Sequence, residues 1–293
     1  MNHDATNPPA VNRRAFLGVA LCGSFSALRG FAPAPTRARD GGRKLSSVGL
    51  QLYTVRGQLA ADFDGTLARV AALGFREVEF AGYHGRAPAE VKSALRRNNL
   101  VAPSAHITTA ELRDGIDKAI DAARVVGHRY LVCGYVPAGE RRSMDDYRRL
   151  ADALNRAGER TLRAGVQLCY HNHDFEFEPA GGQIPYDLLL ARADARLVRA
   201  QLDLYWIAKA GRSALDYFSK HPGRFVSLHV KDMDATPRHS FTEVGRGVID
   251  FKSIFAAAPR AGVRHYFVEQ DETPASPFDS AKASLDYLKR LRF

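Results

Sequence analysis

The sequence predicts an α/β protein built as a single closed (β/α)8 barrel, and three observations support this fold class. From residue 47 onward, short apolar runs rich in β-branched residues alternate with longer amphipathic runs, eight of each. Strict alternation predicts a parallel sheet with helices packed outside it, and eight units over ~250 residues match the size of a TIM barrel. In addition, the first apolar run is not followed by the G-x-G-x-x-G loop of a doubly wound nucleotide-binding sheet.

The two kinds of run can be assigned in chain order. The first amphipathic run follows an acidic start signal at Asp62 or Asp64 and carries Leu67, Val70 and Ala71 at helical spacing. The expected strands are 48–55, 76–80, 100–107, 129–135, 166–173, 197–204, 225–232 and 265–270. The expected helices are 62–75, 88–100, 110–128, 143–165, 184–193, 213–222, 249–262 and 276–291.

The N-terminal residues differ from the rest. In "NRRAFLGVALCGSFSAL", Arg13 and Arg14 precede Phe16, Leu17 and a weakly apolar stretch, which resembles a twin-arginine export signal. We therefore expect residues 1–38 to be a signal peptide, 39–46 a linker and 47–293 the barrel. This predicts the twin-arginine export machinery as a partner and the periplasm as the location.

The charge pattern and hydropathy argue against nucleic-acid and membrane partners, and the cysteine positions predict free thiols. The chain carries a formal charge of +10, but its arginines are mixed with acids along helical runs, as is typical of solvated helix faces rather than a nucleic-acid surface. No apolar run approaches the ~20 residues of a membrane helix, so no membrane contact is expected in the mature form. Cys133 and Cys169 lie in apolar strand runs and are expected to be buried free thiols.

The predicted architecture indicates where an active site would lie. In a (β/α)8 barrel, functional residues lie at the C-terminal ends of the strands. Several charged residues there sit in runs that otherwise look buried, and a buried charge is costly unless it is paired or bound to a metal. The polar residues expected at this rim include Gln51, Tyr53, Glu79, His106, His171, His173, Glu176, Asp203, His229, Lys231 and Glu269.

Six short motifs in strand order carry a family resemblance. "GLQLYTVR", "HNHDFEF", "QLDLYW", "LHVKD", "VGRGVIDF" and "VEQD" together resemble the xylose isomerase-like TIM barrels. More closely, they resemble the exported sugar isomerase/epimerase-like branch of this family, which is similar to inosose dehydratases and ketose 3-epimerases. The resemblance spans about residues 47–293 and implies an enzyme that binds one divalent ion, most commonly Mn, Co or Zn, with Mg as a further option.

The resemblance also implies metal ligands from strands five to eight. Asp203, His229 and Glu269 match the family pattern directly. The strand-five ligand departs from it, because the two glutamates of the epimerases align roughly with Gln167 and His173. Dehydratase-like members take their glutamate from just after this strand, which favours Glu176, with His173 as the rival.

The implied chemistry is sugar isomerisation, epimerisation or a related elimination through an enediolate. His173 or His171 would act as the base, and His106 and Lys231 would orient or protonate the substrate. The residues expected to bind substrate are Gln51, Tyr53, Glu79, Trp206 and Arg246. A periplasmic location favours an unphosphorylated sugar or keto-sugar, and the oligomeric state stays open.

Two other functions match the motifs less well. An endonuclease IV-like abasic-site nuclease would need a "DTCH"-like strand six and an H-x-H acid pair after strand seven, where this chain has "LDLYW" and "MDATPRHS". A non-enzymatic sugar- or metal-binding barrel would not need the complete Asp203, His229 and Glu269 set. A cupin-like spacing from Gly165 to Glu178 does not fit the long helical runs.

The export signal gives a first prediction. Replacing Arg13 and Arg14 with a Lys–Lys pair should keep a fusion protein in the cytoplasm, because the export receptor reads the arginine pair. Cell fractionation would measure this, with the unchanged leader as the control. Unchanged export of the Lys–Lys fusion would contradict the assignment.

Overall fold

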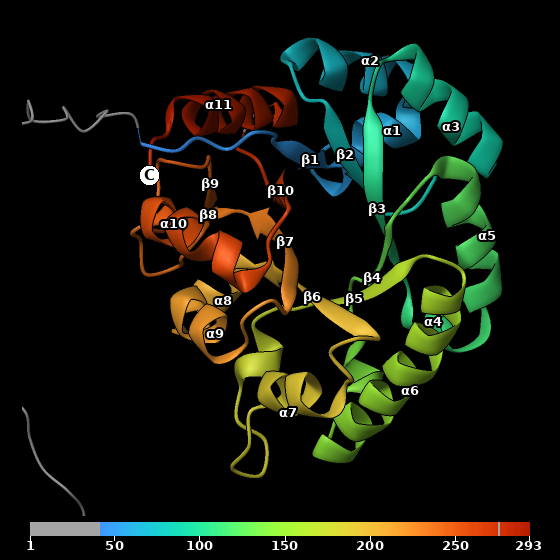
Figure 1. The fold of residues 1–293 in the computed structure, drawn as a ribbon. Helices are drawn as coiled ribbons and strands as arrows, with labels where there is room; N and C mark the ends of the chain where they lie inside the picture. The colour runs from blue at the N-terminus through green and yellow to red at the C-terminus, as the bar shows by residue number, and fades with distance from the viewer. Residues whose placement is uncertain (1–41, 275) are drawn as a thin grey trace, which may run out of the picture. The chain divides into compact units, whose positions relative to one another are not determined.

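A computed structural model describes residues 42–274 and 276–293, and it confirms the predicted barrel. Eight parallel strands close into one barrel in the order β1-β10-β7-β6-β5-β4-β3-β2, with the helices arranged around them (Figure 1). The proposed signal peptide, residues 1–38, lies outside the described residues. The barrel strands are β1 Gly49–Gln51, β2 Glu77–Phe80, β3 Val101–Ile107, β4 Tyr130–Cys133, β5 Gln167–His171, β6 Val198–Asp203, β7 Phe225–Val230 and β10 His265–Val268.

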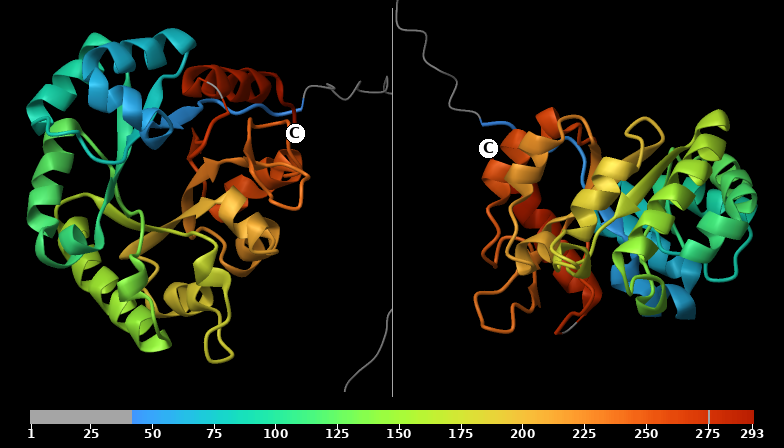
Figure 2. Two further views of the ribbon diagram at one scale, coloured as in Figure 1. Left: turned by 180° about the vertical axis from the view of Figure 1, so that it is seen from behind. Right: turned by 90° about the horizontal axis from the view of Figure 1, so that it is seen from below.

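The helices follow the strands in the predicted order, with small additions. Views from behind and from below show the same ring of helices around the strands (Figure 2). The α-helices are α1 Arg56–Ala61, α2 Phe63–Leu73, α3 Pro88–Arg97, α4 Thr109–Asp114, α5 Ile116–Val126, α6 Met144–Arg163, α7 Pro185–Arg192, α8 Leu204–Lys209, α9 Ala214–Lys220, α10 Phe251–Ala261 and α11 Pro277–Arg290. Gly115 splits the helix expected over 110–128 into α4 and α5.

Short elements at the strand ends depart from the prediction. The first strand is shorter than expected, because the 3-10 helix η1 (Leu52–Val55) follows it at once. Two further 3-10 helices are η2 (Ala138–Glu140) and η3 (Phe175–Phe177). The short strands β8 (Asp232–Met233) and β9 (Phe241–Thr242) form an antiparallel pair after β7.

Two apolar layers stabilise the barrel. The larger one lies where the strands meet the helices and includes Leu50, Phe80, Leu168 and Leu228. A small separate cluster consists of Val132, Cys169 and Val226. Cys169 lies two residues before His171 on β5, so both side chains point to the same side of the strand. The polar site is therefore built next to a small apolar plug within the barrel.

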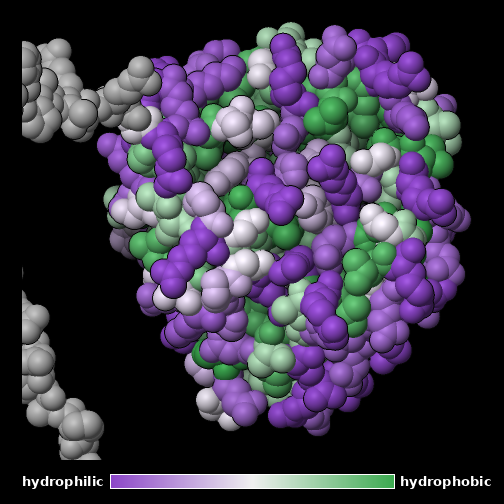
Figure 3. Space-filling model, in the orientation of Figure 1, coloured by the Kyte–Doolittle hydropathy of each residue, from purple (hydrophilic) through white to green (hydrophobic). Residues whose placement is uncertain are grey.

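The outer surface and the thiols agree with the sequence analysis. The face shown in Figure 3 is mainly hydrophilic, with apolar residues interspersed, and α6 carries ion pairs such as Arg148 with Asp145 and Arg149 with Asp146. Cys133 and Cys169 are free and buried, as predicted. Within the described residues, no helix combines the length and apolar character needed to cross a membrane.

Candidate active site

Three candidate metal ligands meet where β6, β7 and β10 end. Asp203 is the last residue of β6, His229 is the penultimate residue of β7, and Glu269 directly follows β10. His229 Nδ1 lies 2.6 Å from Glu269 Oε2 and 3.8 Å from Asp203 Oδ2. All three side chains are buried, and these three atoms have no hydrogen-bond partner of normal geometry. Buried polar atoms of this kind require an explanation such as a bound ion.

An ammonium group lies beside these carboxylates. Lys231 Nζ is 3.0 Å from Asp203 Oδ2, 2.8 Å from Glu269 Oε2 and 2.9 Å from Asp271 Oδ1. Burial alone would lower the pKa of Lys231, but these carboxylates raise it well above its ordinary value. Lys231 is therefore charged, and it offsets one of three negative charges.

The donor types fit a divalent cation. Two carboxylates and one imidazole form a set suited to Mn, Co or Zn. Burial would lower the pKa of His229, but the carboxylates of Glu269 and Glu79 raise it to about 10. Without a cation, the cluster thus holds a proton on His229 as well as the charge of Lys231. This excess of negative charge is what a divalent ion would neutralise.

Glu79 forms the floor of the site. Its Oε1 accepts from Gln51 Nε2 at 2.7 Å and from His229 Nε2 at 2.5 Å, and its Oε2 accepts from Gln201 Nε2 at 2.8 Å and from Ser104 Oγ. Burial would raise the pKa of Glu79, but His106 and His229 keep it well below its ordinary value. Glu79 is therefore an ionised carboxylate surrounded by donors.

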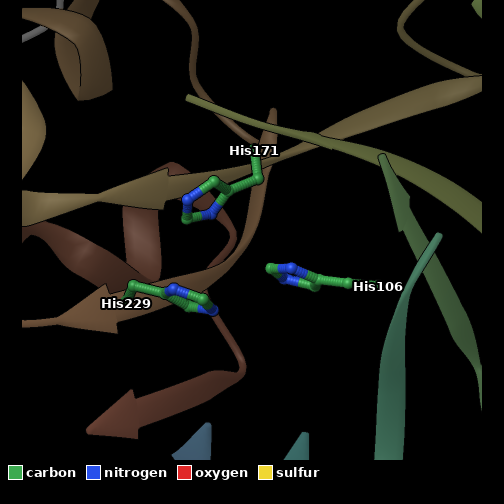
Figure 4. Close-up of side chains that lie close together, drawn as sticks. All are labelled: His106, His171 and His229. Atoms are coloured by element: carbon green, nitrogen blue, oxygen red, sulfur yellow. The ribbon is translucent and has the colours of Figure 1, made fainter. Parts of the chain in front are cut away.

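Three imidazoles converge above this floor. His106 on β3, His171 on β5 and His229 on β7 point toward one another (Figure 4). The rings of His106 and His229 stack with 5.3 Å between centroids, and those of His171 and His229 are 4.5 Å apart. Nitrogens of the three rings lie close enough together to bind one ion.

The strand-five residues separate into three environments. His171 ends β5, and its Nε2 lies 3.7 Å from Asp203 Oδ2. His173 follows the strand, and burial lowers its pKa to about 3. Glu176 turns away: its carboxylate accepts from the Tyr170 hydroxyl at 2.5 Å and from the His173 backbone N–H at 2.7 Å.

A stack of rings and cations forms one wall of the site. Phe175 and His173 lie parallel with centroids 5.3 Å apart, and Trp206 lies 5.4 Å beyond His173. Arg141 covers the end of the stack at Phe175, and Lys209 lies over Trp206. His173 Nδ1 and Trp206 Nε1 are buried there without hydrogen-bond partners.

These elements surround one pocket of about 770 Å³. Aromatic rings and polar or charged side chains both line it, and a concave space of this size is typical of small-molecule sites. Of the predicted site residues, those that line it are Tyr53, His106, His171, His173, Trp206, Lys231 and Glu269.

Comparisons with known proteins now place the chain in a family. The family model described as "Xylose isomerase-like TIM barrel" matches residues 67–291. The chain belongs to the xylose isomerase-like TIM barrel family. The architecture and the family predicted from the sequence are thus both confirmed.

The names of several proteins similar to this xylose isomerase-like chain refer to sugar or inosose chemistry. An inosose dehydratase of Geobacillus thermodenitrificans is 30% identical over 48% of the chain and 53% of the relative, so the chain spans about half of that relative. A sugar phosphate isomerase/epimerase from Parabacteroides distasonis is 26% identical, with a TM-score of 0.73 over 87% of this chain and 96% of the other. The IOLI protein, solved with a bound zinc atom, has a TM-score of 0.67 at 11% identity over 82% and 95% and shares the fold.

Several predicted residues of this xylose isomerase-like barrel lie elsewhere than expected. Gln51 and Glu79 were expected to bind substrate, but they are fully buried and bonded to each other in the floor. Arg246 was expected near the substrate, yet its guanidinium is exposed and pairs with Glu243 in the loop after β9. The flanking glycines instead donate their N–H groups to Asp232.

Glu176 departs most from its predicted role. Its carboxylate is held by Tyr170 and the His173 N–H, on the side of β5 that packs under the helices, since Tyr170 belongs to the outer apolar layer. The structure does not bring it to the unpartnered atoms of Asp203 and His229. Hydrogen bonds to neighbouring groups therefore hold Glu176 away from the metal-ligand position expected from the sequence.

Two functional residues were missed. Gln201 lies two residues before Asp203 on β6 and bonds both Glu79 and His106. The sequence did contain a signal for Gln201: side chains two residues apart on a strand point to the same side, so Gln201 shares a side with the candidate ligand Asp203. Asp271 lines the pocket, and burial raises its pKa to about 6, with the charge of Glu269 adding to the effect. Its position two residues after Glu269 did not distinguish Asp271 from an ordinary acidic residue in a surface loop.

The environment of Glu176 gives a prediction of stability against pH. Burial raises the pKa of Glu176 from 4.5 to about 7, so the folded state keeps a proton that the unfolded state releases. Stability should therefore fall as pH rises from about 4.5 through about 7. Glu176→Gln should remove this fall and gain roughly 1–3 kcal/mol relative to wild type between pH 5 and pH 8.

Urea unfolding in the presence of a chelator would measure the difference. Glu178→Gln removes a charge from an exposed position two residues away and serves as the control. A constant difference between Glu176→Gln and wild type across this pH range would contradict a Glu176 pKa raised by burial.

Proposed function

We propose that this protein is a divalent-metal-dependent sugar isomerase or epimerase, or a related dehydratase or lyase, that acts on an unphosphorylated sugar or keto-sugar through an enediolate. The observation that carries the proposal is the group of buried atoms on Asp203, His229 and Glu269 that have no hydrogen bond of normal geometry, beside a pocket of about 770 Å³. The names of the relatives, inosose dehydratase and sugar phosphate isomerase/epimerase, support the same class of chemistry.

Asp203, His229 and Glu269 would hold the ion, with Mn, Co or Zn preferred and Mg as a further option. Bound there, a divalent cation supplies Lewis acidity that polarises a substrate carbonyl. The zinc atom of the IOLI protein supports this choice of cofactor.

The residues of the chain itself would position the substrate and move its proton. Lys231 faces the pocket with a permanent charge and would orient and stabilise a substrate oxygen. His173 is neutral at working pH, and its unpartnered Nδ1 is available to accept the α-proton. His106 lines the opposite part of the pocket and would contact a hydroxyl, and Tyr53 and Trp206 would enclose the sugar.

The pocket's chemistry favours a neutral polyhydroxylated substrate. Phosphate recognition needs uncommitted cations, but the lysine and the arginine that line this pocket are engaged. Lys231 pairs with three carboxylates, and Arg141 stacks on Phe175 and donates to the carbonyl of Val136. The indole N–H of Trp206, which has no hydrogen-bond partner, instead suits a hydroxyl group.

We further propose that the protein acts in the periplasm after twin-arginine export. The motif around Arg13 and Arg14 supports this. A neutral sugar is consistent with that location, and the folded state in which this route carries its cargo would allow the metal to be loaded before export.

Asp203→Asn tests the metal centre. Asp203 Oδ1 caps α8 by accepting from the N–H groups of Tyr205 and Trp206, and an asparagine keeps that acceptor while losing the charge. We expect bound metal and turnover to be lost while the melting temperature stays near that of wild type. Metal analysis and assays on neutral sugars, inososes, keto-sugars and their phosphates would measure this.

Asp62→Asn is the matched control, because Asp62 caps α2 in the same way at a site outside the pocket. Full metal occupancy in Asp203→Asn would contradict the ligand assignment. Turnover of phosphates alone would contradict the neutral substrate, and metal binding without any turnover would favour a binding protein.

His173→Gln tests the proposed base. It should retain the metal, lose about 10²–10⁴-fold in turnover, and lose exchange of the substrate α-proton with deuterated solvent. His221→Gln, at the end of α9, serves as the control. Loss of metal in His173→Gln would instead assign His173 to the ligand set, and unchanged turnover would remove it from the chemistry.

A further inference from the structure

A buried carboxamide connects the imidazoles of the site to its floor. Gln201 lies on β6 and is fully buried. Its Nε2 is 2.8 Å from Glu79 Oε2 and 3.0 Å from Ser227 Oγ, while its Oε1 is 2.9 Å from His106 Nε2 and 3.1 Å from His171 Nδ1. All four hydrogen-bonding positions of the side chain are therefore used.

The surroundings of Glu79 decide the orientation of this carboxamide. Glu79 receives donors from Gln51, Ser104 and His229, and a carboxylate surrounded by donors is stabilised in its ionised form, which only accepts. The group of Gln201 that faces Glu79 must therefore be its NH₂. The orientation of an amide follows here from its network, and Oε1 must face the two histidines.

The carboxamide in turn decides two tautomers. A carbonyl oxygen only accepts, so His106 Nε2 and His171 Nδ1 must both carry hydrogen. A neutral imidazole has one N–H, which leaves His171 Nε2 with a lone pair. Glu79 likewise requires hydrogen on His229 Nε2, so a cation that displaces the second proton of this ring would meet the lone pair of Nδ1, the atom that faces Glu269.

The lone pair of His171 is directed to the candidate metal centre. His171 Nε2 lies 3.7 Å from Asp203 Oδ2, and the His171 and His229 rings are 4.5 Å apart. Glu176, the alternative on the same segment, already accepts hydrogen bonds on both carboxylate oxygens. We propose that His171, through Nε2, is the strand-five ligand of the metal, and that Gln201 is the positioning residue that fixes this tautomer.

This proposal rests on the metal-dependent function proposed above and adds a specific consequence. Residues that orient a metal-ligating histidine change metal affinity when they are removed, typically by about 10–100-fold. Gln201 contacts His171 and lies behind the ligands, so its removal should act on metal binding before any substrate is present.

Metal affinity of purified full-length variants would test the positioning role. Zn²⁺ dissociation constants would be measured by competition with a chromophoric chelator. Gln201→Leu should weaken binding about 10–100-fold. Gln167→Leu is the matched control. Gln167 is the first residue of β5, at the end of the strand away from His171, and its side chain donates to the carbonyl of Leu197. Equal affinity of Gln201→Leu and wild type would overturn the proposal.

Two further measurements keep the proposal testable if Gln201→Leu folds poorly. His171→Gln should lose the metal while Glu176→Gln keeps it, and the reverse result would overturn the ligand assignment. Imidazole ¹⁵N spectra of the metal-free wild type should show hydrogen on His171 Nδ1 and on His106 Nε2. Hydrogen on His171 Nε2 would overturn the tautomer assignment.

The outcomes separate this inference from the function it rests on. A wild-type chain that binds no Zn²⁺, Co²⁺ or Mn²⁺ would contradict both the proposed metal centre and the ligand role of His171. A wild-type chain that binds metal and turns over sugar, with affinity unaffected in Gln201→Leu and His171→Gln, would contradict only the inference.

Discussion

The site depends on the need to satisfy one buried negative charge. Glu79 has no contact with solvent, so its carboxylate must be compensated entirely within the barrel. It receives donors from four neighbouring side chains that belong to four different strands: Gln51, Ser104, Gln201 and His229. Because each of these donors must point toward the Glu79 carboxylate, the floor of the site is a rigid layer in which the polar groups are hydrogen-bonded.

Above that floor, carboxylates outnumber the cationic groups that could pair with them. Asp203, Glu269 and Asp271 place three carboxylates around the ammonium of Lys231, while the ligand atoms of Asp203 and Glu269 remain without normal hydrogen bonds. In the floor every hydrogen-bonding group has a partner, whereas above it several groups do not. This arrangement is expected of a site whose upper groups are completed by an ion or a substrate.

Strand five shows how local bonding redirects a prediction. The strand ends at His171, so His173 is no longer held to the alternation that would place both rings on one face. The following turn folds back, and the His173 N–H and the Tyr170 hydroxyl capture Glu176. His173 then packs between Phe175 and Trp206. His171 is the residue of this segment whose ring lies near Asp203 and His229, which is why we propose it as the strand-five ligand.

The sequence by itself determined the eightfold alternation, the family, and the rim positions of Asp203, His229 and Glu269. The alternation and the rim positions follow from periodicity and from the rule that strand ends of a parallel barrel share one face, whereas the family follows from the resemblance of six short motifs. Tertiary structure decided the roles of Gln201, Glu79, Arg246 and Glu176. Their roles depend on which polar groups from distant strands meet, because a buried donor or acceptor takes the partner that the closed barrel brings within about 3 Å.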